Sequence, residues 1–360
     1  MDKEKSWLIS DKKYLEKSGF FDSIWGMKIL IATGIYPPAI GGPAQYAKNL
    51  KDAFEKMGNQ VSVVTYGFEK KFPSGIRHIA YFFKILFKSF SSDVIIALDT
   101  FSVGLPAVFA GVISSTRVII RVGGDFLWES YVERTGDMVL LKNFYTVTRG
   151  KWTQKEKMIF SLSEWLLEHT DIIVFSTEWQ KNIWVPVYGI SEDQTAIIEN
   201  FYGEKLQPAV PIQKNFIGST RPLKWKNILR LKEAFTDAEE KDGKISLYLE
   251  NVSYDDFLLK IKNSYAVILV SLGDISPNMI LDSIRYNKPF ILTRETGLYE
   301  KLKEIALFVD PENTKDITDK ILYLSDDNNY QTQKRKIEQF SFTHGWEEIA
   351  HEFLELYKKS

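Results

Sequence analysis

The stretch GDISPNMILD (273–282) combines a helix-start signal with acidic residues on either side of it. Ser276 is a favoured helix N-cap residue and Pro277 suits the first helical position, so the sequence predicts that a helix begins here. The backbone amides of Asn278 and Met279, in the first turn, would have no partner within the helix. Such amides lie at the positive end of the helix dipole and commonly bind phosphate. The stretch therefore predicts a phosphate-binding helix start.

Asp274 and Asp282 flank this helix start, one in the preceding loop and one inside the helix. Because a carboxylate repels phosphate, each is expected to accept hydrogen bonds from neutral hydroxyl groups, which indicates a sugar. The alternative is that two acids near a helix start only complement the helix dipole.

Arg221 and Lys226 lie five positions apart, directly after an expected strand at 215–219 and across a turn centred on Pro222. Arginine offers a fork of donors and lysine a point charge, so the pair could clamp a diphosphate. A further lysine, Lys224, leaves open the alternative of a solvated basic turn.

A second candidate anion site, GIYPPAIGGPAQYAKNL (34–50), follows the expected strand 28–33. Gly41 and Gly42 allow the backbone to approach a ligand closely, and Pro43 suits a first helical turn. Backbone amides there could meet phosphates. The spacing differs from the G-x-G-x-x-G fingerprint of dinucleotide-binding folds, which argues against a dehydrogenase. The alternative is an ordinary loop that needs flexible residues.

A candidate carboxylate lies in RVGGDFLWESYVERTGD (121–137), which follows an expected strand at 117–122. Two glycines make room, and Asp125 stands at the end of the strand, where a ligand-facing carboxylate is expected. The alternative is a turn aspartate that caps its own backbone. Trp128 and Glu129 could contact an acceptor or serve only the structure.

All these candidates follow short apolar runs that alternate with helical patterns. Continuous Val- and Ile-rich runs suit strands buried on both faces, and their alternation with helices predicts doubly wound parallel sheets. A proline-bearing linker at 202–214 interrupts the rhythm, which then restarts in a smaller unit. Ligands of such sheets bind beyond the carboxyl ends of the strands, so the candidates are expected in a cleft between two domains. The other expected strands are 60–65, 93–98, 171–176, 195–199, 245–250, 266–271, 289–293 and 306–310.

Length and composition fit two domains and exclude several classes of function. The chain has 360 residues, of which 44% are hydrophobic, enough for two full cores. The net charge of −1 gives no field that favours nucleic acid, so no nucleic-acid partner is expected. There is no cysteine, which excludes disulfides, thiolate metal sites and cysteine nucleophiles and is compatible with a cytoplasmic location. No apolar run reaches the roughly 18 residues that span a bilayer.

Taken in this order, these motifs and expected strands resemble those of the retaining GT-B glycosyltransferases of family 4, from about Met27 onward. The YPP…GG loop at 36–42, the Arg-x4-Lys pair and the Asp-x7-Asp pair match motifs of that family, the last with aspartates in place of the usual glutamates. The resemblance implies an α/β fold in which two Rossmann-like domains face a cleft and a C-terminal helix crosses back to the first domain. The implied parts are an extension (1–26), an acceptor-side domain (27–205), a donor-side domain (206–340) and the crossing helix (341–360).

The resemblance also implies the reaction, in which a sugar passes from a nucleotide-diphosphate sugar to a glycan or lipid-linked acceptor. The anomeric configuration is retained, and no metal or other cofactor is expected. In the family the first acid contacts the donor sugar and the second holds the ribose. The residues implied to act in catalysis are Asp125, Arg221, Lys226 and Asp274, and those implied to bind the donor are Gly41, Gly42, Arg221, Lys226, Pro277, Asn278, Met279 and Asp282.

Three departures from the family pattern keep an alternative open. Both acids are one methylene shorter than glutamate, and no histidine falls within 121–137. The span between Lys226 and Asp274 is short, as if a strand that helps to hold the base were lost or compressed into 242–253. The alternative function is a catalytically weak or inactive homologue that binds a nucleotide or sugar. A sugar-nucleotide epimerase is a further rival, although the sequence offers no acid–base set for it.

A membrane partner is the alternative for the helix expected at 77–91. The helix contains no acid, and its basic residues Arg77, Lys84 and Lys88 share one face. The favoured prediction is a sheet-packing helix with a solvated basic side, and the alternative is peripheral contact with an anionic membrane at its inner face. Residues 142–157, with five bases against one acid, add modest weight to that contact. The extension is expected to pack on the body.

Overall fold

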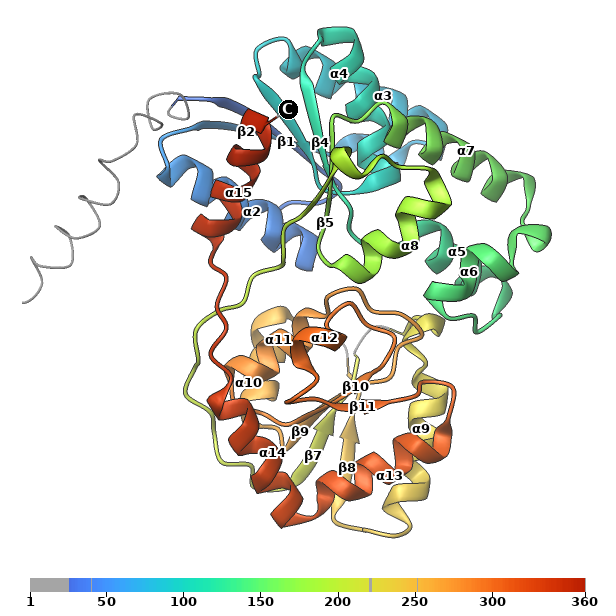
Figure 1. The fold of residues 1–360 in the computed structure, drawn as a ribbon, viewed down its shortest axis with the longest axis vertical. Helices are drawn as coiled ribbons and strands as arrows, with labels where there is room; N and C mark the ends of the chain where they lie inside the picture. Colours follow the sequence, from blue (N-terminus) through green and yellow to red (C-terminus); the bar gives the residue numbers. More distant parts are fainter. Residues whose placement is uncertain (1–25, 40, 220–221, 251, 360) are drawn as a thin grey trace, which may run out of the picture.

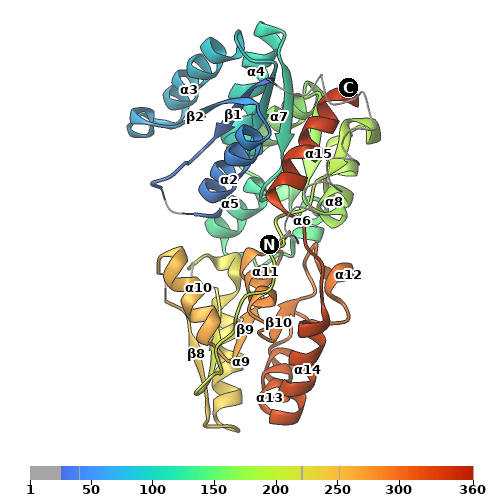
Figure 2. The same cartoon turned by 90° about the vertical axis from the view of Figure 1, so that its left-hand side faces the viewer.

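Two parallel sheets, each covered by helices on both faces, form two domains stacked end to end (Figures 1 and 2). The computed structural model describes residues 26–39, 41–219, 222–250 and 252–359. The predicted extension therefore lies outside the described residues, apart from Gly26. The predicted doubly wound, two-domain architecture is confirmed. The predicted boundary at 205 and 206 falls between the last strand of the first sheet and the first strand of the second.

The first sheet has six parallel strands in the order β2-β1-β3-β4-β5-β6. Its apolar runs are buried on both sides, as in β3 and β5, where every residue is buried. The strands are β1 (Lys28–Thr33), β2 (Gln60–Thr65), β3 (Val94–Ala97), β4 (Arg117–Arg121), β5 (Ile172–Phe175) and β6 (Thr195–Ile197). The helices are α2 (Gly42–Lys56), α3 (Ser74–Ser89), α4 (Leu105–Ser114), α5 (Phe126–Thr135), α6 (Leu141–Val147), α7 (Gln154–Glu168) and α8 (Glu178–Tyr188), with the shorter turns η1 (Phe68–Lys71), η2 (Thr100–Gly104), η3 (Arg149–Lys151) and η4 (Glu192–Gln194).

The second sheet has five parallel strands in the order β11-β10-β9-β7-β8. The strand predicted at 245–250 is present as β8, a four-residue strand at the sheet edge, within the span 242–253 that the sequence suggested to be compressed. The strands are β7 (Lys214–Ile217), β8 (Ile245–Tyr248), β9 (Ala266–Leu269), β10 (Phe290–Thr293) and β11 (Leu307–Val309). The helices are α9 (Ile228–Glu239), α10 (Tyr254–Asn263), α11 (Asn278–Arg285), α12 (Tyr299–Leu302), α13 (Thr314–Ser325) and α14 (Asp327–Gln339), with the turn η5 (Lys224–Lys226).

The last helix, α15 (Trp346–Lys359), returns to the first domain, as predicted, and lies beside α2 (Figure 1). Its fully buried Ile349 and Phe353 belong to the same core as β1 and α2. The rings of Phe353 and Phe54 meet edge to face, with centroids 6.5 Å apart and planes at 69° to each other. The crossing helix is therefore part of the first domain's core, although it follows the second domain in the sequence.

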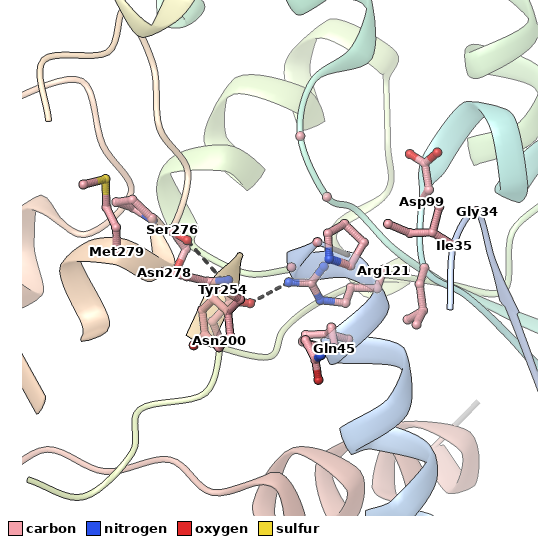
Figure 3. A pocket seen from close by; sticks show the side chains of 18 of the residues that line it. Gly34, Ile35, Gln45, Asp99, Arg121, Asn200, Tyr254, Ser276, Asn278 and Met279 are labelled. Carbon is pink, nitrogen blue, oxygen red and sulfur yellow. Dashed lines mark hydrogen bonds between the residues drawn. The ribbon is translucent and has the colours of Figure 1, made fainter. Parts of the chain in front are cut away.

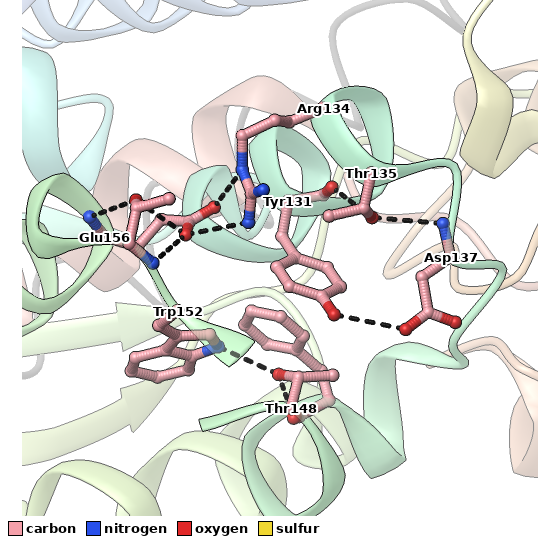
Figure 4. Close-up of polar contacts among 9 residues, drawn as sticks. Tyr131, Arg134, Thr135, Asp137, Thr148, Trp152 and Glu156 are labelled. Atoms are coloured by element: carbon pink, nitrogen blue, oxygen red, sulfur yellow. Dashed lines mark hydrogen bonds and ion pairs between the residues drawn. The ribbon is translucent and has the colours of Figure 1, made fainter. Parts of the chain in front are cut away.

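Helices α5 to α7 form a cluster that is braced by polar contacts (Figure 4). Thr153 and Glu156 form a capping box at the start of α7. The same Glu156 carboxylate receives two hydrogen bonds of 2.9 Å from the Arg134 guanidinium of α5. One buried acid thus fixes both the start of α7 and its position against α5.

This helical cluster is also where the two domains pack together. The rings of Trp128 in α5 and Trp225 in η5 lie 5.4 Å apart between centroids. At its rim, Lys142 forms an ion pair of 2.6 Å with Glu295 of the second domain. The cluster therefore sets how far apart the two sheets stand on this side.

Replacing Glu156 by Gln is expected to lower the free energy of unfolding by about 1–3 kcal/mol at pH 7, because the charge-assisted hydrogen bonds of a buried carboxylate are weakened. Burial opposes ionisation of Glu156, but the hydrogen bonds from Arg134 and Thr153 outweigh it and lower its pKa below the usual 4.5. A carboxyl whose pKa is lower in the folded than in the unfolded state stabilises the fold at pH values above the unfolded-state pKa. For Glu156 this stabilisation is lost as the pH falls from 4.5 through the lowered pKa of the folded state.

Urea denaturation of the parent and the variant at pH 7 and near pH 4 measures both effects. The difference between them should shrink at the lower pH. Asp319→Asn is the matched control, since Asp319 forms an exposed ion pair of 2.6 Å with Lys315 and its loss should change stability very little. A larger loss of unfolding free energy for Asp319→Asn than for Glu156→Gln would contradict the stabilising role assigned to Glu156.

Candidate functional site

A cleft of about 1180 Å³ lies between the two domains. Its walls are residues that follow β1, β2, β3, β4 and β6 of the first sheet and β7 and β9 of the second, so both sheets present their carboxyl ends to it. This is where parallel α/β sheets bind ligands. Of the residues predicted to form a site, the cleft brings together Gly41, Gly42, Lys226, Asp274, Pro277, Asn278, Met279 and Asp282.

The start of α11 forms part of the second domain's wall. The helix begins at Asn278, one residue later than predicted, and Pro277 occupies the N-cap position. The prediction that Ser276 caps the helix is wrong, because no side chain caps it; the backbone oxygen of Ser276 instead accepts a hydrogen bond of 3.4 Å from Asn200. The amides of a first helical turn have no partner within the helix. Those of Asn278 and Met279 are therefore placed to meet an anion in the cleft.

Lys226 and Asp274 form an ion pair across the floor of the cleft. Their side chains lie 2.6 Å apart, and each is only about a tenth exposed, 11% for the lysine and 12% for the aspartate. The Ser271 hydroxyl donates a further hydrogen bond of 3.0 Å to the same carboxylate. The two strands β7 and β9, which are neighbours in the sheet, bring this pair together from positions 48 residues apart. The lysine charge is thus balanced by a protein carboxylate that itself lines the cleft.

Asp282 lies inside α11 and is 5% exposed. The Tyr254 hydroxyl donates a hydrogen bond of 3.1 Å to its carboxylate, and Arg285 lies 3.3 Å from it. Burial raises the pKa of this carboxyl, and the contacts with Arg285 and Tyr254 oppose the rise. The second acid of the pair is therefore a buried acceptor at one end of the cleft, with a tyrosine beside it.

The first domain contributes a second helix start, that of α2. Gly41 has φ 147°, a conformation that other residues rarely adopt, and Gly42 is the first residue of the helix. A Cβ atom on Gly42 would lie 3.3 Å from the side-chain nitrogen of Asn278 at the start of α11. Two helix starts from different domains therefore approach each other across the cleft, and both present the positive ends of their dipoles to it.

Asp125 differs from its prediction. Its side chain is 1% exposed and caps α5 by accepting a hydrogen bond of 3.0 Å from the Trp128 amide. Its other oxygen accepts hydrogen bonds from the Tyr145 hydroxyl at 2.7 Å and the Trp184 indole at 3.0 Å. Burial raises the pKa of this carboxyl. Asp125 borders a small hollow of about 150 Å³. Its contacts are those of the alternative prediction, an aspartate that caps the backbone beside it. A catalytic role for Asp125 stays a prediction.

Arg221, the other cation predicted for the diphosphate, lies outside the described residues. Its neighbours in the sequence, Ser219 and Trp225, line the cleft. The role of Arg221 stays a prediction.

Sequence reasoning missed Arg121, the last residue of β4, which lines the cleft (Figure 3). Its guanidinium lies 4.0 Å from the centre of the Tyr46 ring and donates a hydrogen bond of 2.5 Å to Asn200. Because Asn200 also reaches the Ser276 backbone, these side chains link the two domains across the cleft. A signal was present in the sequence, since Arg121 is the only charge within the apolar run VIIRV at the carboxyl end of an expected strand.

A histidine also reaches the cleft, from an element that the sequence did not connect with it. His78, near the start of α3, lines the wall that the first domain contributes and contacts the Tyr66 hydroxyl at 2.7 Å. Asp99 lies on the same wall and accepts hydrogen bonds from Thr100 and Ser102. The family pattern predicts a histidine only near 121–137, whereas the fold brings His78 to the cleft from α3, which follows β2.

The sequence matches no known protein-family model and no curated protein. The fold, in contrast, matches many solved structures. A sucrose-phosphate synthase from Thermosynechococcus elongatus has a TM-score of 0.68 at 11% identity, and the match covers 93% of this chain and 98% of that one. Anabaena HepE, solved with UDP and glucose, has a TM-score of 0.59 at 12% identity, over 92% and 98%.

A putative UDP-N-acetylglucosamine 2-epimerase from Listeria monocytogenes is similar to the same degree, with a TM-score of 0.59, 14% identity and coverage of 93% and 96%. At these identities the matches establish the GT-B arrangement of two Rossmann-like domains and leave the reaction to be argued from the site.

The two acids of the Asp-x7-Asp pair are expected to respond differently to replacement by Asn. Burial raises the pKa of Asp282, so the fold favours its neutral form and loses stability as the pH rises through that raised pKa. Asp282→Asn should therefore leave the free energy of unfolding at pH 7 unchanged or raise it by up to about 1 kcal/mol. Asp274→Asn should lower it by about 1–3 kcal/mol, because Lys226 loses its carboxylate.

Denaturation curves of the two variants and the parent at pH 7 measure the difference. Each variant is the control for the other, because both make the same chemical change in the same motif. A larger loss of unfolding free energy for Asp282→Asn than for Asp274→Asn would contradict the prediction that Asp274 is the more stabilising of the two carboxylates.

Proposed function

We propose that this protein is a retaining glycosyltransferase that moves a sugar from a nucleotide-diphosphate sugar to a glycan or lipid-linked acceptor. The observation that carries the proposal is the meeting of two helix starts, α2 and α11, across a cleft that also holds the ion pair of Lys226 and Asp274. Helix starts and a lysine suit a diphosphate, and carboxylates suit the hydroxyl groups of a sugar and a ribose. The similar fold of HepE, solved with UDP and glucose, supports the same ligand class.

In the proposed reaction, the acceptor oxygen forms a bond with the anomeric carbon while the bond from that carbon to the diphosphate oxygen breaks. The acceptor proton passes to the leaving diphosphate, so no protein nucleophile is required. The protein stabilises the charge that develops on the diphosphate, through Lys226, Arg221 and the amides of Asn278 and Met279. It also holds the donor sugar through Asp274 and the ribose through Asp282.

The ion pair gives Lys226 and Asp274 a shared role in donor binding. A diphosphate that contacts Lys226 would compete with Asp274 for the ammonium group, which lies 2.6 Å from the carboxylate. The carboxylate would then be available to accept a hydrogen bond from a sugar hydroxyl. Binding of the diphosphate and of the sugar would therefore be coupled through one short contact.

Lys226→Ala and Arg221→Ala are each expected to lower turnover by about 10²-fold, because each removes a cation from the developing charge. A thermal-shift screen of UDP-, GDP- and ADP-sugars first identifies the donor, since a ligand of the native state raises the melting temperature. Transfer is then followed with that donor, and kcat should fall by a larger factor than KM rises.

Lys232→Ala is the matched control, because Lys232 is an exposed lysine of α9 in the same domain and should be replaceable without effect. Unchanged turnover in Lys226→Ala would remove the assigned role. Donor binding without any transfer in the parent protein would support the alternative of a binding protein that has lost turnover.

Metal-independent transfer is part of the proposal, because the chain's own cation and amides can neutralise the diphosphate. Within the described residues, no group of three or more His, Asp or Glu side chains is arranged to hold a metal ion. Turnover is therefore expected to stay within about twofold when EDTA is added in excess and when Mg²⁺ or Mn²⁺ is restored. A loss of about 10²-fold with EDTA that Mg²⁺ or Mn²⁺ reverses would contradict metal independence and leave the transferase assignment standing.

The similarity to a putative epimerase favours a second candidate, an enzyme that converts one nucleotide sugar into another. The two reactions differ in whether an acceptor is required. Incubation of the identified donor without an acceptor separates them, since an epimerase yields a new nucleotide sugar and a transferase releases no isomer.

A further inference from the structure

Helix α3 carries a continuous apolar stripe on its solvent side. Ile76 and Ile79 are 56% and 59% exposed, and Phe83, Phe87 and Phe90 are 48%, 75% and 65% exposed. Their spacing of three or four residues places them on one side of a helix. The opposite side is buried against the sheet through Tyr81 and Ile85. The prediction of a sheet-packing helix is thus correct, but the prediction of a solvated basic side is incomplete, because much of the exposed side is apolar.

The neighbouring helix α4 extends this apolar stripe into a surface. The two helices pack side by side at the outer edge of the first domain (Figure 2). Phe109, Val112 and Ile113 of α4 are 41%, 56% and 57% exposed. The sequence of α4, LPAVFAGVIS, contains no charged residue. We call these eight exposed residues of 76–113 the α3–α4 face.

The charges that α3 and α4 themselves contribute to the α3–α4 face are all positive. Residues 74–92 contain Arg77, Lys84 and Lys88 but no acid. Lys84 forms an ion pair with Glu69, whose side chain is only 7% exposed, while Lys88 is exposed near the most apolar end of the stripe. A second copy of the chain docked through this face would bring the same cations and no acid from either helix. An anionic surface complements the face better.

The face also begins at the cleft. Arg77 and His78, at the start of α3, line the wall of the first domain, and the stripe runs away from them toward Phe90. Within the described residues, no helix is long and apolar enough to cross a bilayer, so any contact with a membrane through these helices lies at its surface.

We propose that the α3–α4 face rests on an anionic lipid bilayer, with its apolar side chains in the interface and Lys88 among the head groups. Exposed aromatic and aliphatic residues bordered by lysines are the composition that binds such a surface. Resting on the proposed function, this contact places the acceptor half of the cleft at the bilayer and selects a lipid-linked acceptor over a water-soluble glycan.

Flotation with vesicles tests the contact without requiring turnover or a known acceptor. The full chain is expected to float with vesicles of phosphatidylglycerol and phosphatidylcholine, and much less with phosphatidylcholine alone or at high salt. The double variant Phe87→Ser/Phe90→Ser should weaken binding by roughly tenfold or more, because each side chain would lose apolar burial in the interface. Lys88→Glu should weaken binding to the anionic vesicles alone.

Leu229→Ser is the matched control, since Leu229 is 84% exposed on α9 of the second domain and should not affect flotation. The melting temperature of each variant, and its shift with UDP, GDP or ADP, verify that the fold and the donor site are intact. No flotation of the parent with anionic vesicles, or equal flotation of the double variant, would overturn the proposal. A parent dimer that the double variant converts to a monomer, without flotation, would assign the face to self-association. None of these failures would affect the transferase assignment, which is decided by the transfer assay.

Discussion

Parallel strands impose one constraint from which the site follows. Each strand must be joined to the next by a returning helix, so all strands of a sheet end on the same edge and the helices that follow them begin there. In this protein the two sheets present those edges to each other across one cleft. The positive ends of α2 and α11 therefore approach each other closely, since a Cβ atom on Gly42 would lie 3.3 Å from the side-chain nitrogen of Asn278.

The protein's own side chains balance part of the positive charge that this arrangement concentrates. Asp274 neutralises Lys226 at 2.6 Å, and Asn200 accepts a hydrogen bond from Arg121. The first-turn amides of Asn278 and Met279 have no acceptor within α11, by the geometry of a helix. Under the proposed function, an entering diphosphate would meet these amides, and Asp274 would exchange its contact with Lys226 for one with a sugar hydroxyl. The diphosphate sugar of the proposed function would engage these same groups.

The parts of the site that could be predicted from the sequence are those fixed by local pattern. The helix start at Asn278 follows from a Ser-Pro-Asn step, and the position of Lys226 beyond a strand follows from an apolar run. Contacts that depend on the order of strands could not be predicted. Arg121 meets Asn200 from 79 positions away because β4 and β6 both end at the cleft, and His78 arrives from a helix that the sequence related only to a sheet or membrane.

Asp125 illustrates a second limit of sequence reasoning. A strand end followed by two glycines locates a carboxylate but leaves its direction open, and the direction depends on Tyr145 and Trp184, which lie 20 and 59 positions further along the chain. These two donors, with the Trp128 amide, turn the carboxylate into the protein. A similar limit holds for α3. Its pattern of polar and apolar residues predicts which side packs against the sheet, but it does not identify what the exposed side contacts.

The return of α15 to the first domain has a consequence for the order in which the chain can fold during synthesis. Ile349, Ala350, Phe353 and Leu354 complete the layer that covers one face of the first sheet, beside residues of β1 and α2. While a ribosome is still translating the second domain, α2 already covers part of that face, but the core residues that contact α15 still lack this helix. The domain made first is therefore finished last, and the second domain, whose two cores draw on residues between 202 and 337, can close before it.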